Sequence, residues 1–198
     1  ENDHEIAFHT MYHDRLDSQG YKEKFPDEIK KFAELTNHKS RGFRAPTFSL
    51  NNNSSWAIDV LAENNYMYDS SVVPAKTSLY GLPNAQVSPY KISSKNIVKN
   101  NSDGTIIEFP LLVTNFLGKK IPAAGGFYLR SLPTKITKNA IKNYEKQGIP
   151  ASFYVHSWEL TPEYMPKLDL PFKDNFTTFH NINDTYKRMS DILEEFEF

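Results

Sequence analysis

The sequence has no cysteine among its 198 residues. This absence excludes a scaffold held by disulfides and every metal site built on thiolates, so a bound metal must be held by histidine and carboxylate side chains. An excess of one charge is also missing, because 23 basic residues face 24 acidic ones and the formal net charge is −1. A protein that binds nucleic acid through bulk electrostatics needs a basic face or stripe, so that class is excluded. No apolar run approaches the roughly 20 residues that span a bilayer, and no transmembrane segment is predicted in this chain.

Apolar residues make up 39% of the sequence, which is enough to build a core. Four segments show the spacing of an amphipathic helix, with apolar residues three and four positions apart. They are residues 22–37, 55–64, 137–147 and 182–196. Between them lie short apolar or β-prone runs, which predict strands. These runs are residues 5–9, 42–45, 66–69, 106–113 and 152–158.

The alternation of strands and helices predicts an α/β fold with a largely parallel sheet, in one domain that spans residues 1–198. A (β/α) barrel typically needs about 250 residues. This chain is shorter, opens without an initiator methionine and runs at once into its first strand. We therefore expect a barrel that lacks its first one or two strands here.

Ionisable side chains follow four of the predicted strands, at the point where each strand ends. His9 and His13 follow the first strand, Arg44 lies at the end of the second, Asp69 at the end of the third, and His156 at the end of the last. In parallel α/β folds the chemistry collects at the carboxyl ends of the strands. We expect these side chains to gather at one edge of the sheet.

His9 and His13 are four residues apart, which would place both imidazoles on one side of a helical turn. From there both could reach one cation at about 2.0–2.1 Å. Such a pair is more often ordinary surface or core histidine, and only its place after a buried strand favours a metal site. A zincin motif is excluded, because it needs glutamate directly after the first histidine and Thr10 stands there.

Arg44 closes an apolar strand and is followed by Pro46 and Thr47. An arginine in this place can hold a carboxylate with two hydrogen bonds and keep it ionised. The proline stiffens the turn and could aim the backbone N–H of Thr47 or Phe48 into the site as an oxyanion donor. The alternative is a structural arginine at a strand end.

His156 ends the last β-prone run and is followed by Trp158 and Glu159. Imidazole titrates near neutral pH, so His156 is a candidate general acid or base. Trp158 would give an apolar wall for a sugar or acyl group, and Glu159 could fix the imidazole tautomer. A histidine at this place can equally be a hydrogen-bonded core residue.

Taken together, these segments resemble the polysaccharide deacetylases of the NodB-homology type (carbohydrate esterase family 4), and more narrowly the branch associated with exopolysaccharide export. The order of the motifs carries the resemblance, which extends from about residue 2 to residue 198. The motifs are His9-Thr10-x-x-His13, Gly42–Pro46, Tyr68–Ser71, Gly125–Arg130 and His156–Glu159.

The resemblance implies a distorted (β/α) barrel and metal-dependent removal of N-acetyl groups from the amino sugars of a polysaccharide. His9 and His13 would bind one divalent ion, with zinc expected and cobalt, nickel or iron as alternatives. Arg44 would orient the catalytic base, and the backbone at Thr47 would help to bind the oxyanion. His156 would protonate the departing amine.

Three further roles follow from the same resemblance. Asp69 would tune the catalytic histidine, and Trp158 and Arg130 would contact the substrate. The aspartate motif that supplies the family's base and third metal ligand has no counterpart in the sequence, and neither Asp3 nor Asp14 is placed to replace it. We therefore expect the 198-residue chain alone to be inactive, and a longer natural protein to be a deacetylase.

Three other interpretations remain open. Related metal-dependent barrels hydrolyse small cyclic amides, and a closed pocket would favour that activity. The chain could also be a non-catalytic, carbohydrate-binding remnant of the fold, which would bind glycan without a metal. The third is a plain α/β domain with scattered histidines, which requires the four strand-end motifs to be coincidental.

Overall fold

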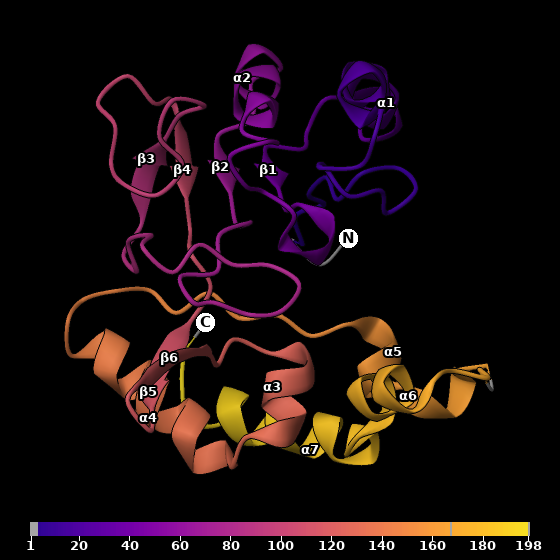
Figure 1. Ribbon diagram of the computed structural model, residues 1–198, viewed down its shortest axis with the longest axis vertical. Coiled ribbons are helices and arrows are strands. Elements are labelled where there is room, and N and C mark those ends of the chain that lie inside the picture. Colours follow the sequence, from indigo (N-terminus) through magenta and orange to yellow (C-terminus); the bar gives the residue numbers. More distant parts are fainter. Residues whose placement is uncertain (1–3, 167, 198) are drawn as a thin grey trace. The chain divides into compact units, whose positions relative to one another are not determined.

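The structure is a computed structural model that describes residues 4–166 and 168–197 (Figure 1). The chain divides into two compact units, Glu1–Leu111 and Leu112–Phe198. Asp3, one of the two aspartates near the histidine pair, lies outside the described residues. Within the described part of the chain, no helix combines the length and the apolar character needed to cross a membrane.

The first unit is built on a four-stranded sheet. Its strands are β1 (Gly42–Phe43), β2 (Tyr68–Asp69), β3 (Tyr90–Ile92) and β4 (Ile106–Glu108). They lie in the order β1-β2-β4-β3, with β1, β2 and β4 parallel and β3 antiparallel to β4. The predicted parallel core of the sheet is confirmed, whereas the antiparallel edge strand β3 was not predicted.

The expected first strand, residues 5–9, is reduced to one parallel bridge between Phe8 and Phe43. The N–H of Phe8 donates to the carbonyl of Gly42 at 2.8 Å, and the N–H of Arg44 donates to the carbonyl of Phe8 at 3.0 Å. This pairing extends the parallel sheet by one short segment. It sets His9 beside Arg44 at the carboxyl end of the sheet.

Helices α1 (Tyr21–Leu35) and α2 (Trp56–Glu63) pack against each other (Figure 1). Both agree with the helices predicted from periodicity, apart from shifts of one or two residues at their ends. Phe25 of α1 lies at the centre of the core and is fully buried. Its ring centroid is 5.4 Å from that of Trp56, 5.6 Å from that of Phe43 and 5.9 Å from those of Phe8 and Tyr21.

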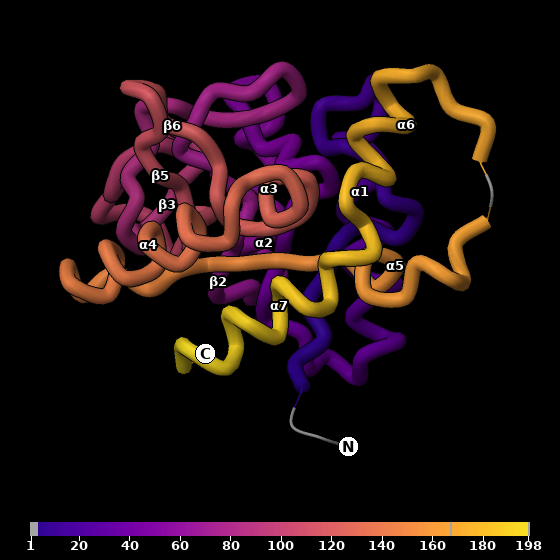
Figure 2. The backbone as a smooth tube through the Cα atoms, turned by 90° about the horizontal axis from the view of Figure 1, so that it is seen from below, coloured from indigo at the N-terminus to yellow at the C-terminus, as the bar shows by residue number. Residues whose placement is uncertain are grey.

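The second unit consists of a β-hairpin and a set of helices. The hairpin pairs β5 (Val113–Phe116) with β6 (Lys119–Pro122). The helices are α3 (Gly126–Ser131), α4 (Thr134–Glu145), α5 (Ser157–Leu160), α6 (Phe172–Phe179) and α7 (Thr185–Leu193). Helix α7 packs against both α3 and α5 (Figure 2). The predicted helix 137–147 is α4, and the predicted segment 182–196 forms a 3-10 turn (Ile182–Asp184) followed by α7.

The strand predicted over residues 152–158 does not form. The segment is extended and makes single bridging contacts, with the N–H of Tyr154 donating to the carbonyl of Ala124 at 2.7 Å. Tyr154 forms a parallel bridge with Gly125, whose φ of +139° and close approach to the Tyr154 carbonyl leave no room for a side chain. Helix α5 then begins at Ser157, so His156 lies where the extended segment ends.

The fold is mixed α/β, as expected, but the described residues form no closed sheet. The larger sheet is open, with β3 at one edge and the Phe8 bridge at the other. Its strands are only two or three residues long. The expected barrel is therefore not confirmed.

Replacement of Phe25 by alanine tests the aromatic core of the first unit. We expect the F25A variant to lose about 3–5 kcal/mol of unfolding free energy, because a large cavity opens among rings that cannot close it. Urea unfolding measures the loss. The matched control is Leu35→Ala at the end of the same helix, where the side chain is 71% exposed and the change should stay within about 0.5 kcal/mol. Equal urea midpoints for the two variants would contradict this account of the core.

Candidate functional site

The parallel segments of the first unit bring polar side chains to the same edge of its sheet. His9 follows the Phe8 bridge, Arg44 follows β1, and Asp69 and Glu108 are the last residues of β2 and β4. The registers pair Phe43 with Asp69 and Asp69 with Glu108. The predicted gathering of His9, Arg44 and Asp69 is therefore present, with Glu108 as an addition.

His9 and His13 lie close together, with ring centroids 5.1 Å apart and planes at 70°. Two imidazoles that bind one ion at about 2.0–2.1 Å have ring centres about 5 Å apart, so the spacing suits a shared ion. His9 Nδ1 lies 2.6 Å from the carbonyl oxygen of Arg44. Because a carbonyl can only accept, Nδ1 carries the proton and the lone pair lies on Nε2, as in most metal-binding histidines.

The segment between these histidines is an irregular loop and not the helical turn that their spacing indicated. Thr10 and His13 both have left-handed backbone conformations, with φ of +57° and +60°. Such conformations are costly for residues other than glycine and occur often at functional sites. The pair thus comes together through a strained loop.

Glu28 of α1 anchors this loop and was not predicted as a site residue. Its side chain is 5% exposed. One carboxylate oxygen accepts hydrogen bonds from the N–H of Met11 at 3.0 Å and from the hydroxyl of Tyr21 at 2.7 Å. The signal in the sequence is its position three residues after Phe25 and one before Ile29, on the apolar face of the helix. A glutamate there must be buried and therefore paired.

The histidine pair could supply two ligands to a metal ion. Among residues 4–166 and 168–197, no cluster of three or more histidine, aspartate or glutamate side chains is arranged to hold a metal ion. The exposed imidazoles of His9 and His13 fit a divalent ion in spacing and tautomer. A third protein ligand is not part of the described arrangement.

The guanidinium of Arg44 is fixed to the end of β2. Nε donates to the carbonyl of Ser70 at 2.9 Å and Nη2 donates to the Ser70 hydroxyl at 2.8 Å. That hydroxyl in turn donates to the carbonyl of Phe109 at 2.8 Å. Arg44 therefore ties three parallel segments together, while its backbone carbonyl orients His9.

The turn after Arg44 contains two successive left-handed residues, Thr47 and Phe48, with φ of +52° and +49°. The N–H of Phe48 donates to the carbonyl of Ala45 at 3.0 Å, so it is not available as an oxyanion donor. For the N–H of Thr47 the structure shows no acceptor among the described residues. Of the two expected donors, Thr47 is the one that the turn leaves for a ligand.

Asp69 and Glu108 form a fully buried carboxyl pair. The hydroxyl of Ser71 donates to Asp69 Oδ1 at 2.5 Å, and the N–H of Val72 donates to Glu108 Oε1 at 2.9 Å. The other two oxygens, Asp69 Oδ2 and Glu108 Oε2, are buried and receive no hydrogen bond within the described residues. A proton on one carboxyl group lets the two bond to each other.

Burial raises the pKa of Asp69 to about 6, and burial together with the neighbouring carboxylate raises the pKa of Glu108 well above its usual value. The pair therefore holds a proton under conditions where exposed carboxyl groups have lost theirs. Asp69 and His156 belong to different units, so the expected effect of Asp69 on that histidine stays a prediction.

The buried pair makes stability depend on pH. Since the folded state binds protons more tightly than the unfolded state, the unfolding free energy should fall as the pH rises from about 4 through 6 and above, by an amount on the order of 1–3 kcal/mol. Glu108→Gln should flatten this dependence and raise stability above pH 6, because it removes one buried charge and its amide can donate to Asp69. Urea unfolding between pH 4 and 8 measures the effect. The exposed Glu63→Gln serves as control, and an E108Q profile parallel to the wild type would refute a shared proton.

In the second unit, Glu159 holds the imidazole of His156. Its Oε2 lies 2.7 Å from His156 Nδ1 and accepts the N–H of the same residue at 2.9 Å. Burial alone would raise the pKa of the Glu159 carboxyl group, but hydrogen bonds from His156 and Arg130 hold that pKa below its usual value. The expected contact of Glu159 with the imidazole is confirmed. With Nδ1–H turned to the carboxylate, Nε2 remains for chemistry on a side chain that is 47% exposed.

Arg130 is 2% exposed and uses its guanidinium inside the protein. Nε donates to Glu159 Oε1 at 2.8 Å, and the two terminal nitrogens donate to the carbonyls of His180 at 2.7 Å and Thr177 at 3.0 Å. These contacts differ from the expected contact with substrate. They give Arg130 a positioning role, because it fixes the carboxylate that orients His156.

Trp158 stacks on His156, with ring centroids 5.3 Å apart and planes at 20°. The guanidinium of Arg130 lies 5.9 Å from the centre of the indole. The indole is partly exposed, so it can present an apolar surface beside the imidazole, as expected. It also limits the positions that the imidazole can adopt.

Removal of the Arg130 charge tests the buried ion pair. Arg130→Met should cost about 3–5 kcal/mol of unfolding free energy, because it leaves the Glu159 carboxylate buried without its partner. Adding Glu159→Gln to this variant should restore part of the loss. The control is Lys138→Met in the more exposed pair with Glu195, which should cost less than about 1 kcal/mol. If the losses of unfolding free energy from Arg130→Met and Glu159→Gln simply add in the double variant, the two side chains are not energetically coupled.

Comparison with known proteins identifies a matching family and a related structure. Residues 70–198 match the model of a family described as a domain of unknown function, DUF3473. A search of curated proteins finds no significant match. Among solved structures, the chain is similar to a crystal structure named "putative polysaccharide deacetylase" from Mycobacterium smegmatis, with 15% identity and a TM-score of 0.51. The match covers 98% of this chain and 58% of that one, so the chain spans little more than half of that protein. At this identity the similarity shows the fold alone.

Proposed function

We propose that this chain, which belongs to the DUF3473 family, acts in a metal-dependent hydrolase that removes N-acetyl groups from the amino sugars of a polysaccharide. DUF3473 is a domain found in polysaccharide deacetylase-like proteins. The resemblance indicated by the sequence motifs is confirmed at the level of the family. Three of those motifs, around Ser71, Arg130 and His156, overlap the matched residues. The exopolysaccharide branch is part of the proposal.

The observation that carries the proposal is the oriented histidine pair. His9 Nδ1–H is turned to a backbone carbonyl and its ring lies 5.1 Å from that of His13. We assign these two residues to one divalent ion, with zinc favoured over cobalt, nickel or iron. Such an ion, when bound, polarises the acetyl carbonyl and lowers the pKa of a water molecule.

Other residues would bind the oxyanion, protonate the departing amine and orient the catalytic base. The N–H of Thr47 would donate to the oxyanion that forms from the acetyl carbonyl. His156 Nε2 would give its proton to the departing amine, with Glu159 fixing the ring and Trp158 shielding it. Arg44 would orient the carboxylate of the catalytic base.

The proposal requires a third metal ligand and a base, because amide hydrolysis depends on proton removal from water, and a base typically contributes 10²–10⁴-fold. We place both outside the described arrangement, together with strands that would close the sheet into a barrel. The deacetylase would then need polypeptide beyond these 198 residues. Hydrolysis of a cyclic amide and metal-free glycan binding are the competing outcomes.

Metal titration of the 198-residue chain tests the histidine pair directly. Calorimetry with Zn²⁺ or Co²⁺ should show one site, and His9→Ala or His13→Ala should weaken it at least about tenfold, because each removes one ligand. The exposed His38→Ala and the second-unit His156→Asn should leave the affinity unchanged. Binding that survives the His9 and His13 substitutions would refute the site.

Acetate release from N-acetylglucosamine oligomers then tests the reaction in the longer protein. There, His156→Asn should lower kcat by about 10²–10⁴-fold without loss of metal. Turnover of a cyclic amide in place of the oligomers would favour the first competing outcome. Glycan binding without a metal site would favour the second.

A further inference from the structure

A pocket of about 350 Å³ lies in the first unit, next to the turn that holds Thr47. Its walls come from three stretches of chain, around Arg15, around Phe48–Asn51 and around Tyr80. The volume lies at the lower end of the range for small-molecule sites, about 300–1,000 Å³. None of the pocket's polar residues has a role in the chemistry proposed above.

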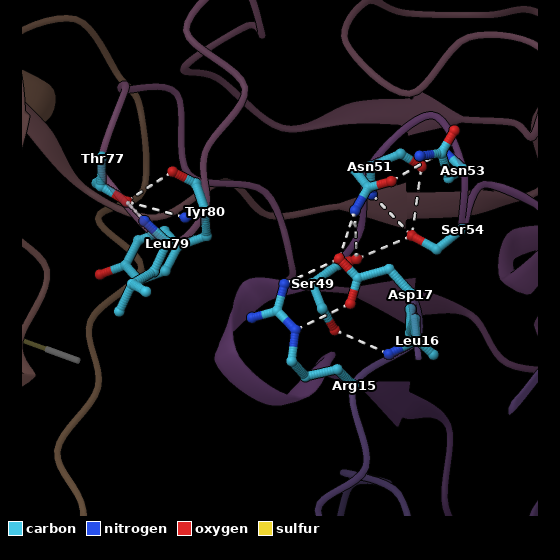
Figure 3. A network of polar contacts seen from close by, with 10 residues as sticks. All are labelled: Arg15, Leu16, Asp17, Ser49, Asn51, Asn53, Ser54, Thr77, Leu79 and Tyr80. Carbon is cyan, nitrogen blue, oxygen red and sulfur yellow. Dashed lines mark hydrogen bonds and ion pairs between the residues drawn. The ribbon is translucent and has the colours of Figure 1, made fainter. Parts of the chain in front are cut away.

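One wall is a planar polar array. Arg15 Nε and Nη2 each donate to one carboxylate oxygen of Asp17 at 2.9 Å. Asn51 Nδ2 donates to Asp17 Oδ2 at 3.0 Å and to the carbonyl of Ser49 at 3.2 Å. Hydrogen bonds from Arg15 hold the pKa of Asp17 below its usual value, so the array stays ionised and its two charges offset each other. It offers donors and acceptors in fixed directions (Figure 3).

The other wall is aromatic. The ring of Tyr80 lies 5.1 Å from that of Phe48, at 61°. The backbone of Tyr80 is fixed by Thr77, whose hydroxyl accepts from the Tyr80 N–H at 3.0 Å and donates to its carbonyl at 2.6 Å (Figure 3). Gly81 follows with φ of +118°, where a side chain would collide with the Ala75 carbonyl. The ring is therefore held by a stiff turn.

We propose that this pocket binds one sugar residue of the acetylated polymer, adjacent to the residue that reacts. A pyranose ring has apolar C–H faces, which pack on aromatic rings, and hydroxyl groups, which match paired donors and acceptors. The charges of Arg15 and Asp17 offset each other, and Lys76, which is exposed, also lines the pocket and adds a donor for hydroxyl or carbonyl oxygens. Phe48 belongs to both the pocket and the turn of Thr47, so a sugar here would be next to the acetyl group. The inference rests on the proposed function for the identity of the sugar.

Calorimetric titration of metal-free protein with N-acetylglucosamine tetramer tests the pocket without turnover. Tyr80→Ala should weaken binding about tenfold and Tyr80→Phe should restore it, because the ring supplies the contact. Leu79→Trp should weaken binding by obstruction; its side chain lines the pocket and is 65% exposed, so the variant keeps its core. Tyr164→Ala, an 81% exposed aromatic of the second unit, is the matched control.

The outcomes separate this inference from the proposed reaction. Binding lowered by Y80A and L79W, but not by Y164A, supports the pocket even if no acetate is released. Equal binding by all variants, or no binding by the wild type, overturns the pocket even if the longer protein is an active deacetylase. Preference for an oligomer of uronic acids over the acetylated tetramer would also overturn it.

Discussion

The hydrogen bond from His9 to the carbonyl of Arg44 is the constraint on which the first-unit site depends. It exists because Phe8 pairs with Phe43 of β1, so that the next residues in each segment, His9 and Arg44, lie side by side. The bond fixes the imidazole tautomer, with the proton on Nδ1 and the lone pair on Nε2. The strained loop next to it is held at two points, because the sheet fixes one end and the Met11 N–H in the middle donates a part-buried hydrogen bond to Glu28. Without the register of this single bridge, the histidines would have no fixed relation to the other strand ends.

Three buried glutamates take part in positioning, and each has different partners. Glu28 holds the loop between the histidines through a backbone N–H and a tyrosine hydroxyl. Glu108 accepts the N–H of Val72 after β2 and lies next to the Asp69 carboxyl group, and burial together with this neighbour raises the pKa of Glu108. The negative charge of Glu159 is paired with Arg130, and its carboxylate orients His156. Burying a charge costs free energy that good geometry only partly offsets. Such groups therefore contribute more to the placement of site residues than to stability, and their positions mark where the fold needs a fixed geometry.

The sequence predicted α1, α2, α4 and α7, because an apolar face with helical period is a local signal that survives folding, whereas α3, α5 and α6 were not predicted. Short apolar runs predicted the parallel strands, and the carboxyl ends of these strands predicted the joint position of His9, Arg44 and Asp69. It did not predict partners that depend on contacts between distant segments. Glu28 and Glu108 carried a readable signal, a charge within an apolar pattern, whereas the burial of Arg130 depends on carbonyls some fifty residues away. The hairpin β5–β6 was also not predicted, because its two-residue turn places Leu117 at positive φ, where hairpin turns usually have asparagine, aspartate or glycine.

The partners of His9 and His156 distinguish the chemical roles proposed for these residues better than their positions do. A histidine that binds a metal must be neutral at one nitrogen, and a carbonyl partner at Nδ1, as at His9, fixes the tautomer without favouring a second proton. A histidine that donates a proton benefits from an anionic partner, which attracts the charged imidazolium, as Glu159 does at His156. For that, the carboxylate must not take the proton itself. Against the effect of burial, hydrogen bonds from His156 and, to a smaller extent, from the buried Arg130 hold the pKa of Glu159 below its usual value and so keep the carboxylate ionised. The same residue type is thus suited to a ligand in one unit and to an acid in the other by the group that accepts its Nδ1–H.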